Sequence, residues 1–192
     1  MRGVDPSCAV SALLVSPHFT LRTVLPLLLA AYADAYGYRE AALGDLGGAY
    51  SAGALAAALA ILVLGGRHLR RVVGLGLLLG SAALSALLLP LPLAVLKLAF
   101  VLFGVGCGGV YAAMLAWLAT HPVPSRVLAW QWGVGTLPGL LMLIAIPLLG
   151  RGAGGLERTL LLLLLGNGIA ALGVRGVPRD LTPPRPVASG VL

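Results

Sequence analysis

Two ionisable side chains lie inside long apolar stretches, where a charge is a candidate for function because burying it is costly. Asp34 falls in "TVLPLLLAAYADAY" and Lys97 in "LPLAVLKLAF". If these stretches cross a membrane, Asp34 could exchange protons, or it could lie among the headgroups beside Tyr32, Tyr36 and Tyr38 in an aromatic belt. Lys97 is a candidate for substrate binding or gating, or its ammonium reaches the headgroups along its own stem.

Three neutral polar residues, Tyr111, Gln131 and Asn167, also fall in apolar stretches. They could line a cavity that binds a solute. Alternatively, each forms a hydrogen bond between helices, which is the ordinary use of polar side chains in membrane bundles. Asp45 begins an apolar run, where it is expected to cap a helix.

The residue patterns of the common enzyme classes are missing from the sequence. The three histidines have no acidic or histidine neighbour at metal-ligand spacing, and the two cysteines, Cys8 and Cys107, are far apart. "YSAG" at 50–53 departs from the G-x-S-x-G of serine hydrolases, and there is no phosphate-binding loop. We therefore expect no enzyme activity, no cofactor and no metal site.

The composition is that of an integral membrane protein. Of the 192 residues, 59% are hydrophobic and only 10% are charged, where soluble domains carry about 25% charged residues. The mean hydropathy is +1.01. The net charge of +7 is spread between apolar runs rather than gathered in a basic domain, so nucleic-acid binding is not expected.

The apolar runs predict an all-α bundle of six transmembrane helices, since a spanning helix needs about 20 apolar residues. Residues 1–17 are expected to be an N-terminal tail, 18–175 the transmembrane domain and 176–192 a disordered cytoplasmic tail. The expected spans are about Thr20–Tyr38, Leu43–Leu64, Val72–Leu89, Leu93–Thr120, Val127–Leu149 and Leu156–Val174.

The positive charges predict the orientation. Basic residues are enriched on the cytoplasmic side of membrane proteins, and the two sides of this chain are unequal. One side collects nine of them, namely Arg2, Arg22, Arg67, Arg70, Arg71, Arg126, Arg175, Arg179 and Arg185, and the other collects four, namely Arg39, Lys97, Arg151 and Arg158. Both termini are therefore expected in the cytoplasm of a multi-pass protein of the cell (inner) membrane.

Glycines four residues apart predict close contacts between helices, because small residues let backbones approach in lipid. The pairs include Gly104–Gly108, with Gly106 between them, and Gly135–Gly139. Ordinary bundle packing is one interpretation, and dimerisation through such a face is the other. Pro138 lies within its span and is expected to bend it.

The order of these landmarks resembles one six-helix half of the major facilitator superfamily. The small-residue span that ends in "GGRHLRR" resembles that family's basic loop G-x-x-x-D-R-x-G-R-R at Gly66, Arg67, Arg70 and Arg71, without its Asp. In the family that Asp helps to lock a cytoplasmic gate. The fourth span, "FGVGCGGVYAAMLAWLATHPVPSR", is similar to the family's glycine-rich fourth span and is followed by Arg126.

"GVGTLPGLL" resembles the family's Gly-Pro antiporter motif through Gly135, Pro138 and Gly139. Lys97 stands one turn before Phe100, which occupies the place of the arginine found in many proton-coupled members. The gate resemblance implies a gating role for the loop arginines and Arg126. The alternative is that these arginines meet anionic lipid headgroups.

The resemblance implies a 3+3 arrangement of helices and a transport function. Complete members have two six-helix halves with the substrate between them, so this chain would move a small solute by alternating access as a homodimer or with a second six-helix subunit. The alternative is a membrane scaffold or assembly subunit that does not transport.

Overall fold

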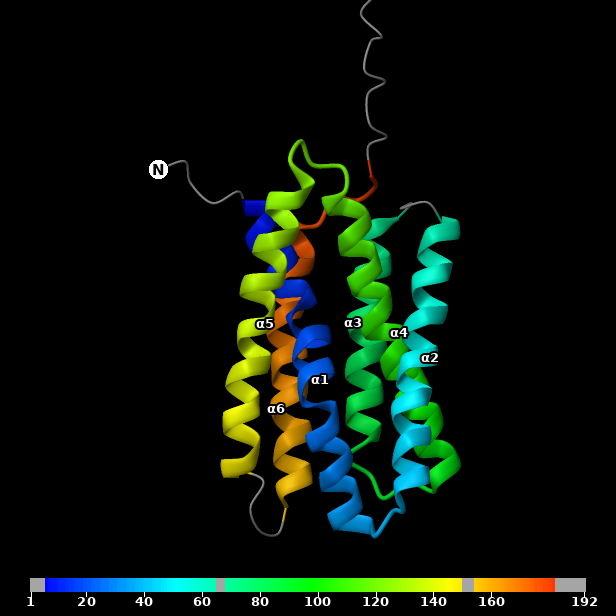
Figure 1. Ribbon diagram of the computed structural model, residues 1–192. Helices are drawn as coiled ribbons and strands as arrows, with labels where there is room; N and C mark the ends of the chain where they lie inside the picture. Colours follow the sequence, from blue (N-terminus) through cyan, green and yellow to red (C-terminus); the bar gives the residue numbers. More distant parts are fainter. Residues whose placement is uncertain (1–5, 65–67, 150–153, 182–192) are drawn as a thin grey trace, which may run out of the picture.

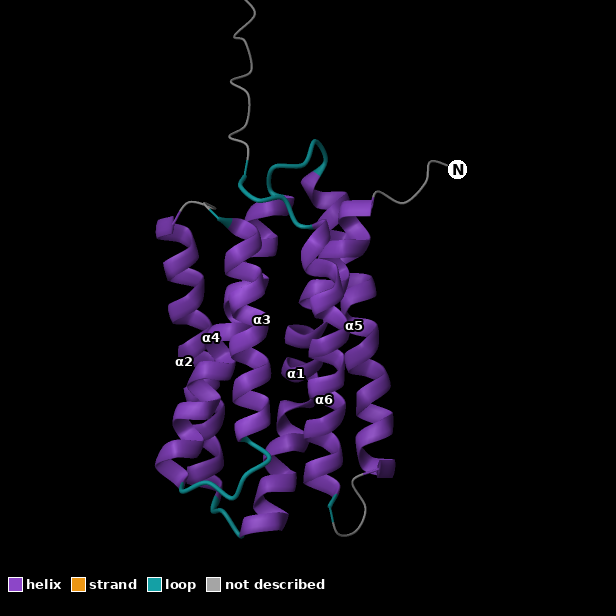
Figure 2. Cartoon of the chain, turned by 180° about the vertical axis from the view of Figure 1, so that it is seen from behind, coloured by secondary structure: helices purple, strands orange, loops and turns teal. Residues whose placement is uncertain are grey.

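The computed structural model describes residues 6–64, 68–149 and 154–181 (Figure 1). Over these residues the chain is a helical bundle with no strand (Figure 2). Its elements are α1 Pro6–Tyr36, α2 Glu40–Leu64, α3 Leu69–Ala86, α4 Leu93–Leu118, α5 Pro124–Leu149, α6 Gly155–Ala171 and the short 3₁₀ helix η1 Leu172–Gly176.

Among the described residues, six helices are long and apolar enough to cross a membrane. The expected all-α, six-span architecture of a multi-pass membrane protein is confirmed at this level. Successive helices run in opposite directions, so the described part of the chain begins and ends at the same end of the bundle (Figure 1). The N-termini of α3 and α5 lie at that end too, with Arg70, Arg71 and Arg126.

The first helix begins at Pro6, well before the expected start at Thr20. Pro17 lies inside it, and such prolines are tolerated in membrane helices because neighbouring groups re-satisfy the backbone. Leu14 and Val15 are fully buried and pack in one apolar cluster with residues of α3 and α4. Residues 6–17, expected in a tail, are therefore part of the bundle.

The early start changes the position of Arg22. With 16 residues of α1 before it and 14 after it, Arg22 lies at the middle of the helix rather than at its end. Without Arg22, the nine basic residues on the expected cytoplasmic side become eight, against four on the other. The charge asymmetry that predicts the orientation is therefore preserved.

The segment after η1 also packs on the bundle. Val177 is fully buried, and its carbonyl accepts a 2.7 Å hydrogen bond from Nε of Arg70. Asp180 accepts a 2.7 Å hydrogen bond at Oδ1 from the backbone N–H of His68. The expected disordered tail from residue 176 thus includes an ordered stretch to Leu181, and residues 182–192 lie outside the described part.

Glycines of α4 lie at the closest helix contacts. A Cβ at Gly104 or Gly108 would collide with the backbone of α2, and a Cβ at Gly106 would stand 2.5 Å from the carbonyl oxygen of Gly76 in α3. The backbone of α4 therefore lies in close contact with the backbone of α2 on one side and with that of α3 on another.

α5 packs on α1 in a similar way. A Cβ at Gly135 would meet the Phe19 ring at 3.0 Å, and one at Gly139 would meet Thr23 Oγ1 at 3.1 Å. Pro138 lies between these glycines inside α5, which continues to Leu149. The most extensive helix pairs are α2–α4, α1–α5 and α3–α4.

Candidate functional site

Arg22 is the starting point of the site because it is a charged residue in the middle of a membrane-spanning helix. Its side chain is exposed on the bundle surface. Placing an arginine at the centre of a spanning helix costs about 2.5–3.5 kcal/mol on insertion scales, and such residues mark substrate and ion pathways. Its retention in this position therefore needs a function or a partner.

No acidic residue is placed to neutralise Arg22 within residues 6–64, 68–149 and 154–181. The acids there lie at or beyond helix ends: Asp34, Glu40, Asp45, Glu157 and Asp180. The two ion pairs in the described part join His68 to Asp180 and Lys97 to Asp45. The middle of the bundle thus carries one positive charge and no described negative one.

Polar and aromatic side chains from three helices gather beside Arg22. A 3.1 Å hydrogen bond joins Nδ1 of His18, one turn earlier in α1, to the Tyr50 hydroxyl in α2. The His18 ring stacks on Tyr111 of α4 at 4.7 Å between centroids, with 12° between the planes. Arg22 lies one helical turn after His18 on the same face of α1. We call Arg22, His18, Tyr50 and Tyr111 the Arg22 cluster.

An aromatic wall continues the cluster toward α5. The Phe19 ring lies edge-on to Tyr111 at 5.6 Å and 5.0 Å from the ring of Trp132. His18 and Tyr50 are buried, Tyr111 is half-buried, and Trp132 and Arg22 are exposed. The cluster therefore has a buried inner layer, His18 and Tyr50, and an outer layer in which Arg22 and Trp132 are exposed.

Of the residues expected to bind substrate, Tyr111 alone is shown within this cluster. Gln131 is fully buried in α5, and neither its amide nitrogen nor its amide oxygen has a hydrogen-bond partner among the described residues. A buried amide without partners is unusual. It lies one turn before Gly135, the glycine that contacts Phe19.

Asn167 forms hydrogen bonds between helices, which was the alternative to lining a cavity. Its Nδ2 donates to the carbonyl oxygen of Leu77 at 3.0 Å and to Oγ of Ser81 at 2.7 Å, both in α3. The residue is buried. These bonds tie α6 to α3 and occupy the amide nitrogen.

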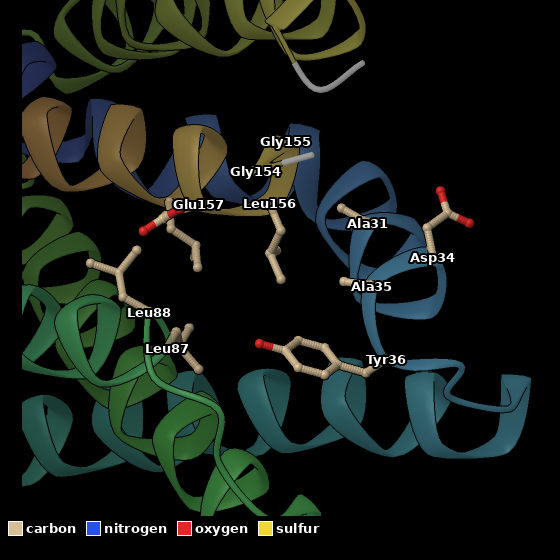
Figure 3. A pocket seen from close by; sticks show the side chains of 11 residues that line it. Ala31, Asp34, Ala35, Tyr36, Leu87, Leu88, Gly154, Gly155, Leu156 and Glu157 are labelled. Atoms are coloured by element: carbon tan, nitrogen blue, oxygen red, sulfur yellow. The ribbon is translucent and has the colours of Figure 1, made fainter. Parts of the chain in front are cut away.

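Asp34 is not brought together with the Arg22 cluster. It lies twelve residues further along α1, which is roughly 18 Å along a helix. It borders a pocket of about 490 Å³ between the ends of α1, α3 and α6, together with Tyr36 and Glu157. In Figure 3 the Tyr36 hydroxyl points into this pocket, whereas the Asp34 carboxylate is turned away from it.

Lys97 forms an ion pair at the same end of the molecule. Its Nζ lies 2.6 Å from Oδ2 of Asp45, which joins the start of α4 to the start of α2. Both side chains are partly exposed, at 38% for Lys97 and 59% for Asp45. The pair links two helices, and Lys97 lies 14 residues before Tyr111 in α4, which is roughly 21 Å along a helix.

Three of the five residues of the expected gate can be placed. Gly66 and Arg67 lie outside the described residues. Arg70 is held by the Val177 carbonyl, while Arg71 and Arg126 are exposed. Asp180 hydrogen bonds to the residue that precedes α3, so the segment after α6 supplies a carboxylate beside a loop that has none.

His18, Arg22 and Tyr50 were not expected in a site from the sequence. The dipeptide Pro17–His18 suggests a helix boundary, which places Arg22 at a helix end. The available signal is the apolar run "CAVSALLV" just before it, which allows the span to begin earlier and puts His18 and Arg22 on one helix face at a spacing of four. Tyr50 could not be paired with His18 from the local pattern.

Comparison of the chain with known protein families, characterised proteins and solved structures gave no match.

Proposed function

We propose that the chain is a half-size transporter that moves a small solute by alternating access, as a homodimer or with a second six-helix subunit. The observation that carries the proposal is the Arg22 cluster. It places an exposed cation half-way along α1, beside His18, Tyr50 and Tyr111, and transporters bind substrate near the middle of their spanning helices.

The helix pairing supports a 3+3 arrangement. If the first three helices are matched in order with the last three, α1 corresponds to α4, α2 to α5 and α3 to α6. Under this correspondence the pair α1–α5 becomes α4–α2, and the pair α3–α4 becomes α6–α1. All four pairs are in contact. Internal repeats of this kind build each half of major facilitator transporters, which adds to the resemblance of the loop and glycine motifs.

The open sides of α2 and α5 support the need for a second six-helix unit. These two helices are the least covered of the six, each with 22% of its most apolar window buried. They pack through one face on α4 and α1, which carry Tyr111 and Arg22. A second unit lying against α2 and α5 would enclose the Arg22 cluster between two halves.

The test is a substrate-blind uptake measurement. Vesicles that contain the purified chain are incubated with a defined mixture of small metabolites, and their contents are compared by mass spectrometry with those of protein-free vesicles. We expect at least one solute to accumulate with the chain, and Arg22→Gln to lower its initial rate at least tenfold. Equal contents in both kinds of vesicle would contradict a transport function.

The alternative is a membrane scaffold or assembly subunit. The scarcity of charge favours it, because Arg22 is the one charged residue half-way along the described helices. Cross-linking in the native membrane separates the two proposals. A stable pair of six-helix units supports transport, and a single chain joined to an unrelated complex supports the scaffold.

A further inference from the structure

We propose that the Arg22 cluster binds the anionic group of a small organic solute, so that the transported substrate is a carboxylate or a phosphate ester with an apolar or aromatic part. This inference rests on the proposed transport function only in calling the bound solute a substrate. The binding of an anion by the cluster stands on its own observations.

The first observation is the charge balance. Arg22 is exposed half-way along α1, and the acids of the described residues are all at or beyond helix ends. A cation in a region of low dielectric constant attracts a counter-ion strongly. Since the described part of the chain provides none, a ligand that brings its own negative charge is the natural partner.

The second observation is the type of donor. The guanidinium of an arginine presents a planar fork that matches a carboxylate or a phosphate with two parallel hydrogen bonds. Tyr111, whose half-buried ring stacks on His18 one turn from Arg22, has a hydroxyl that can donate to a remaining oxygen. Tyr50 is engaged with His18, so the inner layer holds the outer donors in place rather than binding directly.

The third observation concerns the rest of the ligand. Tyr111, Phe19 and Trp132 form a chain of ring contacts from α4 through α1 to α5, at 5.6 Å and 5.0 Å between centroids. Trp132 is 45% exposed. A flat or apolar group attached to the anion would lie against these rings, which a bare inorganic ion would leave uncovered.

The carboxylate could come from two sources, a soluble organic acid or a fatty acid within the bilayer. The experiment uses the full-length chain in phosphatidylcholine vesicles and follows tryptophan fluorescence. The probes are 4-nitrobenzoate, neutral 4-nitrobenzamide and cationic 4-nitrobenzylamine, which share a quenching ring and differ in charge. Benzoate and oleate are then added as competitors to separate the two sources.

We expect 4-nitrobenzoate to quench saturably, and the amide and the amine to bind at least tenfold more weakly. Arg22→Gln should raise the Kd for 4-nitrobenzoate at least tenfold, and Arg22→Lys, which keeps the charge and loses the fork, should raise it less. The control Arg126→Gln removes an exposed arginine at the start of α5 and should leave the Kd within twofold of its original value.

Equal binding of the carboxylate and the amide by the unaltered chain would overturn the proposal, and this comparison needs no variant to fold. A Kd unchanged in Arg22→Gln would overturn it as well. Displacement by benzoate supports a soluble substrate, whereas displacement by oleate alone assigns the anion to lipid and overturns the substrate class.

Uptake in the same vesicles separates this inference from the proposed function. If 4-nitrobenzoate binds in an Arg22-dependent manner and no solute of the mixture enters, the anion site stands and transport fails. If a neutral or cationic solute enters at a rate that Arg22→Gln does not change, transport stands and the anionic substrate class is wrong.

Discussion

At the scale of single residues, the polar side chains of the bundle divide into two kinds. Asn167 and Lys97 have partners on neighbouring helices within the chain. Arg22 has no acidic partner in the described part. The first kind stabilises the bundle, whereas the second kind is where a ligand can contribute binding energy.

Replacing Asn167 should therefore affect stability rather than uptake. Asn167→Ala removes the hydrogen bonds to Leu77 and Ser81, and interhelical hydrogen bonds in membrane bundles contribute about 0.6–1.7 kcal/mol. We expect a loss of about 1–2 kcal/mol in the free energy of unfolding in detergent micelles. Gly168→Ala, at a position in α6 where a Cβ would meet nothing within 4 Å, is the control. An equal loss in both variants would contradict the role of the amide.

Asp34 and Arg22 should differ in their effect on transport. Asp34 is exposed and turned away from the pocket it borders, a placement that favours the headgroup interpretation over proton coupling. We expect Asp34→Asn to keep the uptake rate within twofold at every pH, while Arg22→Gln lowers it at least tenfold. The measurement is initial uptake into vesicles between pH 5 and pH 8. A pH dependence lost in Asp34→Asn would restore the proton-coupling hypothesis.

At the scale of elements, α4 is the centre of one half of the bundle because its glycines bring it against α2 and α3. Gly104 and Gly109 provide a matched pair on this helix. A Cβ at Gly104 would collide with the backbone of Tyr50, whereas one at Gly109 would lie 3.7 Å from Cβ of Ala57, an ordinary contact. Both substitutions to alanine gain the same helix propensity, so their difference reports on packing alone.

Gly104→Ala should separate α2 from α4 and destabilise the bundle by about 1–3 kcal/mol, the usual effect of overpacking. Gly109→Ala should leave stability unchanged or raise it. Thermal unfolding in detergent and the fraction of folded protein on size exclusion measure both. Equal behaviour of the two variants would show that the α2–α4 contact tolerates an added methyl group.

The number of helices was predictable because the thickness of a bilayer sets the length of an apolar run. The start of α1 was not, since Pro17 and His18 have the local character of a boundary, and only the burial of Leu14 and Val15 against α3 and α4 shows that the helix continues. The position of Arg22 depends on that start. The Arg22 cluster could therefore not be predicted, because the expected start of α1 was too late. The pairing of His18 with Tyr50 depends on tertiary packing.

At the scale of the whole molecule, Arg22 and Trp132 of the Arg22 cluster and its aromatic wall are exposed in the described part of the chain. Ser51 in α2 and Thr136 in α5 are near the same depth, 13 residues before Leu64 and 12 after Pro124. A two-fold homodimer that encloses the Arg22 cluster would bring α2 of one copy to α5 of the other, because an isologous interface pairs the same two surfaces reciprocally.

Two differently tagged copies, one with Ser51→Cys and one with Thr136→Cys, should then join through a flexible bis-maleimide in native membranes. Both native cysteines are buried, which keeps the background low.

Ala82→Cys is the control for the α2 position. It is exposed on α3, 13 residues after Leu69 and so at a similar depth. It should not join to Thr136→Cys, because α3 belongs to the outer side of a dimer that meets through α2 and α5. Joining of the α3 cysteine alone would place the interface away from Arg22, and the absence of any joined pair would favour a second subunit or the scaffold alternative over a homodimer.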